Sequence, residues 1–283
     1  MSIDWTWLRC PNCFGDLSPV DDRAYGCDHG HRFDPSKHGY LTLLPPRAPR
    51  TTGDDREMLV SRAALLDRGA YRPIAEELAR AALPANPGQA EVRLRVADLG
   101  CGTGYYSRFL SEALPDADFL LADRSPDAVR AALRAVPSAS GVVLDIWRPL
   151  PLRDDVADVV LNVFAPRNPS EFARILRPGG RLVVVVPHVH HLRELRELGL
   201  LLDVPAQKAE TVTDRLAAVG LVPRGAARVQ YVLEADPDTR ALLAGMGPSA
   251  HHAVSLAGRP AGGDLDVTIA VDVLAFQLIS PSG

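Results

Sequence analysis

From residue 92 onward, short apolar runs alternate with amphipathic ones, and this alternation most limits how the chain can fold. The apolar runs include "RLRVADLG", "DFLLAD", "SGVVLDI", "VADVVLNVF" and "RLVVVVP". Between them, "YSRFLSEAL", "PDAVRAALRA" and "PSEFARILR" repeat apolar residues at helical spacing. Strands that alternate with helices build a mostly parallel sheet with helices on both faces, whose ligands bind beyond the carboxyl ends of the strands. We therefore predict an α/β fold of this kind.

The segments before and after this series have helix, strand and linker patterns of their own. Residues 54–83 have a helical pattern interrupted at Gly69 and Pro73, which predicts two helices meeting at Tyr71. Near the other end, "ARVQYVLEA" and "DLDVTIAVDVLAFQLI" alternate well enough to predict an antiparallel pair of edge strands. The polar, Pro-rich residues 45–55 predict a linker. The expected parts are an N-terminal module (1–44), a linker with helices (45–90) and a large domain (91–283).

A glycine-rich turn, "VADLGCGTG" at 96–104, predicts a cofactor site. Its glycines at 100, 102 and 104 let the backbone approach a ligand closely before the next helix begins. Asp123 and Asp145 end the next two predicted strands, and an acid about 20 residues after such a turn accepts hydrogen bonds from a ribose diol. The spacing alone leaves both NAD and S-adenosylmethionine (SAM) open.

The N-terminal residues predict a metal site. Cys10 and Cys13 form a CxxC knuckle, and Cys27 with His31 makes a second pair thirteen residues beyond Cys13. Three cysteines and one histidine are a ligand set for Zn²⁺. His29 competes with His31 for the fourth position, but the longer Cys27-x3-His31 spacing leaves more room to close a tetrahedron, so His31 is favoured.

The predicted zinc site is structural, because all four ligands come from the protein and leave no open position for a substrate. Residues 1–40 contain few aliphatic side chains, so the metal is expected to replace a hydrophobic core there. On this view the module is separable, and its deletion should leave cofactor binding nearly intact.

The opening residues, the cysteines and the net charge indicate the compartment and the partners of the protein. The opening "MSIDWTWLR" lacks the basic start and apolar run of a secretory signal, and "RLVVVVP" is far shorter than the ~20 residues of a membrane helix. Four cysteines, three of them in the predicted zinc site, suit a reducing compartment. We expect a soluble cytoplasmic protein with no membrane partner. A net charge of −4 restricts any nucleic-acid contact to a local patch.

In chain order, the cysteine knuckle, "GYLTLLPP", "VADLGCGTG", "LNVFAPRNPSEFARILRPGG" and "MGPS" resemble the RlmA/TlrB family of 23S rRNA guanine-N1 methyltransferases. The resemblance covers nearly all 283 residues, and "NVFAPRNP" and "MGPS" are most similar to the actinobacterial tylosin-resistance type. It implies a class I, Rossmann-like SAM-dependent methyltransferase domain and a zinc module that recognises RNA. The implied substrate is a guanine in a 23S rRNA hairpin loop near the peptide exit tunnel, and the implied benefit is macrolide resistance.

The resemblance also implies roles in cofactor binding. Asp98 precedes the glycine turn, and with residues 100–104 it would surround the methionine part of SAM. Asp123 would bind the ribose hydroxyls, and Asp145 with its neighbour would flank the adenine. The expected SAM-binding residues are Asp98, Gly100, Gly102, Thr103, Gly104, Asp123, Arg124, Asp145 and Ile146.

Guanine N1 carries a proton, so a nearby acceptor, or a donor to O6, should assist methyl transfer. The segment that lines the acceptor pocket in the family is "NVFAPRN" at 162–168, and it contains no carboxylate. Asn162 is expected to hold a base edge and Phe164 to stack on the base. Arg167 is a candidate for contact with O6 or phosphate.

His191, in "PHVHHLREL", matches a His-Leu of the family and is the candidate base, because its unperturbed pKa suits proton acceptance. An equally open alternative is that His188, His190 and His191 are loop residues that cap the next helix. The expected catalytic residues are Asn162, Phe164 and His191.

One departure from the family concerns the target. Where the tylosin-resistance enzyme has Trp after "MGPS", this chain has His251, whose ring offers a smaller stacking face. The alternatives are a small-molecule methyltransferase of an antibiotic pathway and a non-catalytic RNA-binding protein. The expected partner is 23S rRNA, and a homodimer is allowed.

Overall fold

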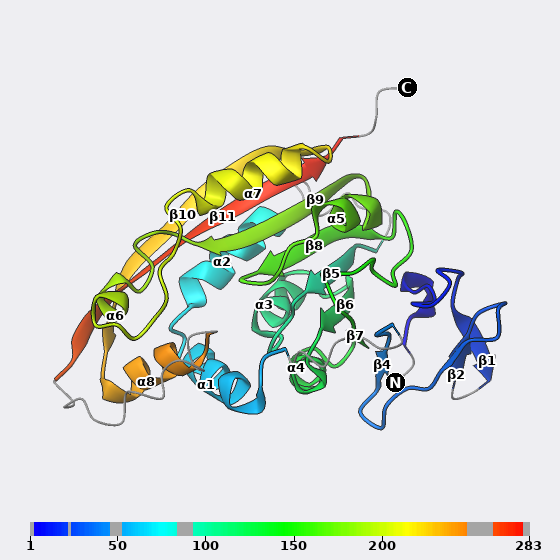
Figure 1. Cartoon of the computed structure of the whole chain (residues 1–283), viewed down its shortest axis with the longest axis horizontal. Coiled ribbons are helices and arrows are strands. Elements are labelled where there is room, and N and C mark those ends of the chain that lie inside the picture. Colours follow the sequence, from blue (N-terminus) through cyan, green and yellow to red (C-terminus); the bar gives the residue numbers. More distant parts are fainter. Residues whose placement is uncertain (1–2, 22–23, 46–52, 84–92, 248–262, 280–283) are drawn as a thin grey trace.

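The computed structural model describes residues 3–21, 24–45, 53–83, 93–247 and 263–279. Its centre is an eight-stranded sheet in which β9 to β4 run parallel, while β11 is antiparallel to both β9 and β10 (Figure 1). In spatial order the strands are β10 (Leu221–Ala235), β11 (Leu265–Leu278), β9 (Leu176–Pro187), β8 (Ala157–Val163), β5 (Arg95–Leu99), β6 (Asp118–Asp123), β7 (Ser140–Val143) and β4 (Tyr40–Thr42). The predicted mostly parallel sheet and its antiparallel edge pair are confirmed.

Two hydrophobic cores cover the two faces of this sheet. One contains residues of α1 (Arg56–Asp67), α2 (Arg72–Ala82), α3 (Tyr105–Ala113), α4 (Pro126–Ala135), α6 (Arg193–Glu197) and α8 (Pro237–Gly245). The other contains residues of α5 (Pro169–Ile175), α7 (Lys208–Ala217) and the N-terminal module. As predicted, two helices meet at Tyr71, which is the N-cap of α2.

The N-terminal module consists of the 3₁₀ helix η1 (Trp5–Trp7) and a small antiparallel sheet of β1 (Ser18–Asp21), β2 (Ala24–Gly26) and β3 (Arg32–Phe33). It lies against residues 144–156, a connection between β7 and β8 that contains no helix. The module therefore covers a part of the sheet where a crossover helix would otherwise pack.

Hydrogen bonds fix the module to that connection. The Arg9 N–H donates to the Pro151 carbonyl over 3.0 Å, and the Arg153 N–H donates to the Trp7 carbonyl over 2.9 Å. The Arg153 guanidinium donates to two further module carbonyls, those of Leu8 and Leu17, at 3.0 Å each. Contacts of this kind are characteristic of one folded unit rather than of a tethered appendage.

The expectation that residues 1–40 lack a core was wrong. Ile3, Trp7, Leu8, Leu17 and Tyr25 are buried and belong to the same core as the strands of the large sheet. Apolar residues are few in this segment, but their side chains pack against the large sheet. The core of the module is therefore shared with the larger domain. Metal binding supplements this core instead of replacing it.

The predicted domain boundary also differs from the structure. β4 lies inside the segment 1–44 assigned to the module, yet it pairs in parallel with β7 as the edge strand of the large sheet. The short run "YLT" has no pattern that would separate the two assignments. Most of the predicted linker, residues 46–52, lies outside the described residues.

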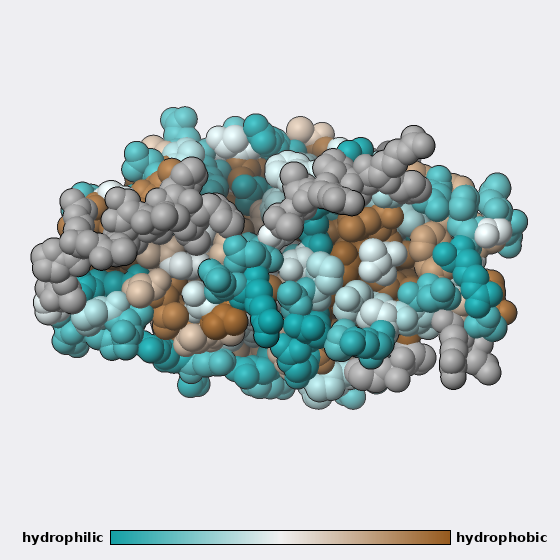
Figure 2. All heavy atoms as spheres, turned by 60° about the horizontal axis from the view of Figure 1, so that its bottom comes forward, coloured by the Kyte–Doolittle hydropathy of each residue, from teal (hydrophilic) through white to brown (hydrophobic). Residues whose placement is uncertain are grey.

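Among the described residues, no helix is long and apolar enough to cross a membrane. Among the coloured atoms of the face drawn in Figure 2, hydrophilic and apolar side chains are interspersed.

Candidate active site and metal centre

The glycine turn follows β5 and has no room for side chains at two positions. Gly100 and Gly104 have φ values of 92° and 78°, in the left-handed region that favours glycine. A Cβ at Gly100 would collide with Ala165, and one at Gly104 would lie 2.7 Å from the Cα of Ala132. The turn is therefore packed between α4 and the segment after β8, and only Gly100 and Thr103 in it are partly exposed.

Asp98 lies just before this turn and is only 2% exposed. Its Oδ2 accepts a hydrogen bond from the Ser107 hydroxyl over 2.6 Å, whereas its Oδ1 has no partner among the described residues. Burial raises the pKa of Asp98 to about 7, against the opposing effect of the Ser107 hydrogen bond. A buried carboxylate oxygen without a partner suits a cationic donor, such as the ammonium group of a methionine moiety.

Asp123 ends β6 and ties that strand to the turn. Its Oδ2 accepts the Gly102 N–H over 3.0 Å, and its Oδ1 accepts the Ser125 N–H over 2.9 Å. Burial raises the pKa of this carboxyl, while the two backbone hydrogen bonds oppose the rise. A carboxylate has about four lone-pair sites, so Asp123 can still accept hydrogen bonds from ribose hydroxyls.

The third acid, Asp145, follows β7 and is also buried. Its Oδ2 pairs with the Arg124 guanidinium, and its Oδ1 accepts the Trp147 N–H over 3.1 Å. Ile146 is buried beside it, and Thr103 lies half-buried in the glycine turn. The structure thus brings the predicted cofactor residues together at the carboxyl ends of β5, β6 and β7.

Asn162, on β8, has a defined amide orientation. Its Nδ2 donates to the carbonyls of Leu99 and Pro166, at 3.1 and 2.8 Å. The side chain is buried, and its Oδ1 has no hydrogen-bond partner among the described residues. Since both amide hydrogens are occupied, Asn162 can only accept from a ligand. The glycine turn, the acids and the unpartnered Oδ1 of Asp98 fit SAM. The unpartnered Oδ1 of Asn162 fits a base that carries N–H groups.

Phe164, two residues farther on, is 40% exposed and has a φ of 51°, which is unfavourable for a bulky side chain. Its ring lies parallel to that of His191, with centroids 6.1 Å apart and an interplanar angle of 15°. Tyr71 packs against both rings, at 6.2 Å from Phe164 and 6.0 Å from His191. These three rings form an aromatic cluster around the predicted stacking residue.

The surroundings of His191 favour a structural role over that of a base. Its Nδ1 accepts the Ala270 N–H over 3.2 Å, and its Nε2 lies 3.3 Å from the Tyr71 hydroxyl. Burial, together with the charges of Arg196 and Lys208, lowers the pKa of His191 to about 3. The ring is therefore neutral at pH 7, and its accepting nitrogen is already occupied.

The remaining candidates fall at the margins of this site. The Arg167 guanidinium donates to the Ala165 carbonyl over 3.3 Å. His188 and His190 contact each other in the loop before α6, with ring centroids 4.9 Å apart. His251 lies outside the described residues. Tyr71 and Ser107 were not predicted from the sequence, because neither belongs to a motif and only their contacts indicate a role.

The four predicted metal ligands form one cluster, with ligand atoms within 4.8 Å of one another. The Sγ atoms of Cys10 and Cys27 lie 3.5 and 3.4 Å from His31 Nδ1, and the Sγ atoms of Cys13 and Cys27 are 3.5 Å apart. Bond lengths near 2.0 Å for Zn–N and 2.3 Å for Zn–S give tetrahedral edges of roughly 3.5–3.8 Å, so the group fits Zn²⁺. His29 is exposed and is not part of the cluster.

Two family models match the chain. Residues 8–51 match the N-terminal zinc ribbon of RlmA, and residues 96–180 match a methyltransferase domain. The described part of the fold is similar to the YcgJ protein of Bacillus subtilis, with a TM-score of 0.52 at 16% identity over 75% of this chain and all of that one. This likeness supports the fold alone.

The relatives found by sequence identify the family more closely than the fold does. The 23S rRNA (guanine(748)-N(1))-methyltransferase of Streptomyces fradiae is 43% identical over 247 residues, which cover 87% of this chain and 86% of that protein. A Bacillus subtilis protein assigned to the same reaction class, YxjB, is 31% identical over 284 residues, or 96% of this chain and 98% of its own. The chain therefore belongs to the family of 23S rRNA (guanine-N1)-methyltransferases, and it is a SAM-dependent methyltransferase with an N-terminal zinc ribbon.

Proposed function

We propose that this enzyme transfers a methyl group from SAM to N1 of a guanine in a 23S rRNA hairpin loop near the peptide exit tunnel. The observation that carries the proposal is the 43% identity to the Streptomyces fradiae enzyme, which extends over 87% of this chain. A ribosomal substrate implies that the enzyme acts in the cytoplasm. Methylation near the exit tunnel would lower the affinity of the ribosome for macrolides. A homodimer stays a prediction.

Bound SAM supplies a methyl group that is already a good electrophile, so the protein contributes mainly through position. Oδ1 of Asp98 and the glycine turn would hold the methionine part, and Asp123 would hold the ribose. Asp145 and Ile146 would flank the adenine from the end of β7. These contacts would place the methyl group beside Asn162.

Asn162 would bind the edge of the guanine. Its free Oδ1 can accept a hydrogen from N1 or from the 2-amino group, and its fixed orientation means that little reorganisation is needed. An amide oxygen is a weak base, so Asn162 would position N1 while the proton leaves to water. Phe164 would stack on the base, and the Tyr71–His191 pair would hold the Phe164 ring in its strained conformation.

We further propose that Cys10, Cys13, Cys27 and His31 ligate the zinc ion and that the module contributes to RNA recognition. A small substrate by itself gives no reason for a separate RNA-reading module, so the presence of the module favours rRNA over a small molecule. The structure weakens that argument, because buried residues such as Trp7 and Leu8 make the module part of the core, whatever the substrate. The small-molecule alternative must therefore be decided by assay.

The test supplies labelled SAM to the purified full-length protein with unmodified 23S rRNA transcript and, separately, with macrolide precursors. We expect label in the rRNA and none in the small molecules. Transfer to a precursor without transfer to rRNA would replace the proposed substrate with the alternative one. The Asn162→Ala variant, assayed alongside, should bind SAM but lose most transfer.

A further inference from the structure

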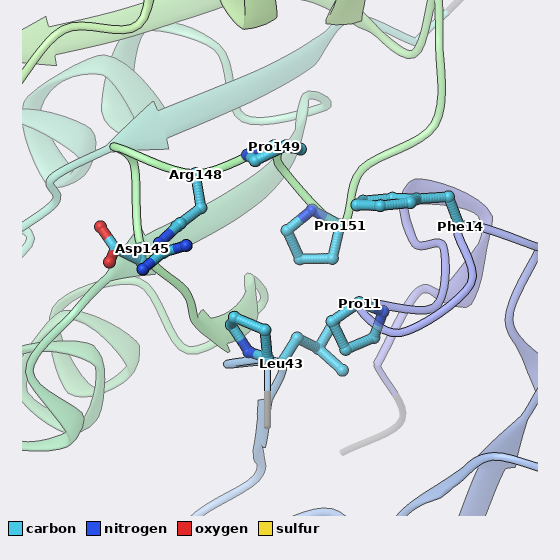
Figure 3. Close-up of a pocket in the computed structure, with 8 residues that line it drawn as sticks. Pro11, Phe14, Leu43, Asp145, Arg148, Pro149 and Pro151 are labelled. Carbon is cyan, nitrogen blue, oxygen red and sulfur yellow. The ribbon is translucent and has the colours of Figure 1, made fainter. Parts of the chain in front are cut away.

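A small pocket lies where the N-terminal module meets the connection after β7 (Figure 3). It has a volume of about 110 Å³, well above the ~15 Å³ that a single water needs. One wall belongs to the module and the other to the connection after β7, so the pocket forms only when the module packs against that connection. Its lining includes Pro11, Phe14, Arg148 and Pro151, and also Asp145, the acid that would flank the adenine, so the pocket adjoins the proposed SAM site. We call it the Phe14 pocket.

Phe14 is an unusual residue for its position. The knuckle places it in the left-handed region, with a φ of 58°, and its N–H donates to the Cys10 carbonyl over 2.9 Å. Glycine or asparagine adopts this conformation more readily than a bulky aromatic residue. The ring is also 41% exposed, so burial does not compensate for the strain. Strained residues of this kind concentrate at functional sites.

The Phe14 ring is held in place from one side. The Arg9 guanidinium lies over it, 4.8 Å from the ring centroid. Arg9 is itself fixed by the Leu150 carbonyl at 3.2 Å and by Asp154 at 3.3 Å. The ring is therefore a preorganised surface rather than a freely rotating side chain, which reduces the entropy lost when a ligand stacks on it.

The opposite wall carries an available cation. Arg148 is exposed, and no hydrogen bond or ion pair involves its guanidinium within the part of the chain that the structure describes. Figure 3 shows the Arg148 side chain on the side of Asp145, with Pro151 between it and Phe14 and Pro11. Aromatic rings and guanidinium planes are the groups on which unstacked RNA bases stack.

We propose that the Phe14 pocket binds an unstacked nucleobase of the rRNA, at a position other than the methylated guanine. The inference rests on the proposed function and adds a second contact to it. The methylated base would enter at Asn162 and Phe164, at the end of β8, whereas the pocket lies between the module and the end of β7. Extruding a target base from its stack is unfavourable by a few kcal/mol, which a stacked neighbour can offset. With a net charge of −4, the chain has little general electrostatic attraction for RNA.

The experiment compares Phe14→Asn and Phe14→Trp with the wild-type full-length protein. Asn tolerates the left-handed backbone, so the knuckle should keep its fold and its zinc while the stacking surface is lost. We expect Phe14→Asn to raise KM for an unmodified 23S rRNA transcript, and Kd in filter binding, by roughly 5- to 150-fold, the effect of losing one base stack. The kcat, SAM affinity and zinc content should not change, and Phe14→Trp should retain wild-type RNA affinity.

Val20→Ala is the matched control, because Val20 is an apolar residue of the same module that is 52% exposed and does not line the pocket. Unchanged RNA affinity in Phe14→Asn, with an active wild type, would overturn this inference and leave the proposed function standing. Weaker SAM binding in Phe14→Asn would also overturn it, since the pocket would then belong to the cofactor. A wild type that neither binds nor methylates rRNA would remove both proposals.

Discussion

The backbone N–H of Ala270 donates a hydrogen bond to Nδ1 of His191 over 3.2 Å. A backbone N–H cannot accept, so Nδ1 must be unprotonated and the neutral ring carries its hydrogen on Nε2. That hydrogen points to the Tyr71 oxygen, 3.3 Å away. The contact thus defines the tautomer of a buried histidine beside the predicted acceptor pocket.

His191 should make the fold sensitive to acid. Burial lowers its pKa from 6.5 to about 3, so between these values the unfolded chain binds a proton that the folded chain does not. Stability is therefore lost as pH falls from about 6.5 toward 3, and the loss is at most a few kcal/mol. Urea unfolding at pH 7.5 and pH 5 should show a larger decrease in the wild type than in His191→Asn. Equal decreases in the two proteins would contradict the assignment.

Asp123→Asn should weaken SAM binding. Removing a carboxylate that accepts charge-assisted hydrogen bonds is expected to lower the binding free energy by about 1.5 to 3 kcal/mol. Titration calorimetry measures this directly, with Asp127→Asn as the control, because Asp127 is a partly exposed acid of α4 that pairs with Arg130 on the same helix. SAM affinity that is the same in both variants would reject a ribose contact at Asp123.

His31→Ala should abolish zinc binding, and His29→Ala should not. Only His31 places its Nδ1 within reach of the three thiolates, whereas His29 is exposed outside the cluster. Elemental analysis of freshly purified protein should find about one zinc per chain in the wild type and in His29→Ala. The reverse pattern would assign the fourth ligand to His29.

Trp7→Ala should destabilise the whole protein rather than the module alone. The side chain is fully buried, contributes to the core shared with the large sheet, and lies under the Arg95 guanidinium at 4.0 Å. Truncation of a buried aromatic residue lowers the free energy of unfolding by about 3 to 5 kcal/mol. Calorimetric melting should show one transition, shifted to lower temperature, while the control Val20→Ala should melt like the wild type.

A second transition that moves alone in Trp7→Ala would show instead that the module unfolds independently. For the same reason, deletion of residues 1–40 should lose SAM binding along with the fold. The expectation that such a deletion leaves cofactor binding intact is therefore withdrawn, because the structure places five buried apolar residues of that segment in the shared core.

Local patterns were enough to predict where the glycine turn and the acids lie in the fold, while their contacts with SAM stay a proposal. The turn at Gly100, the acids at the ends of β6 and β7, and the cysteine pairs each lie within a few residues of a strand end or knuckle, and short-range spacing determines their geometry. The fold class followed from the alternation of strand and helix patterns, which also depends only on neighbouring residues.

Long-range contacts could not be predicted in this way. Tyr71 and His191 are 120 positions apart, and nothing in either segment indicates that their side chains meet. The Arg153 guanidinium donates to the Leu8 carbonyl, 145 positions away. The packing of the module against the large domain therefore could not be predicted from sequence patterns either. Edge strand β4 has only three residues, which is too short for a periodic pattern.

The most direct test of the central claim is to identify the methylated atom. 23S rRNA transcript treated with the purified protein and SAM should be digested to nucleosides for mass spectrometry, and a parallel sample should be read by primer extension. We predict 1-methylguanosine as the methylated product and one strong polymerase stop within a hairpin loop, because N1 methylation blocks base pairing. A methyl group on another guanine atom, or on another base, without such a stop would contradict the account.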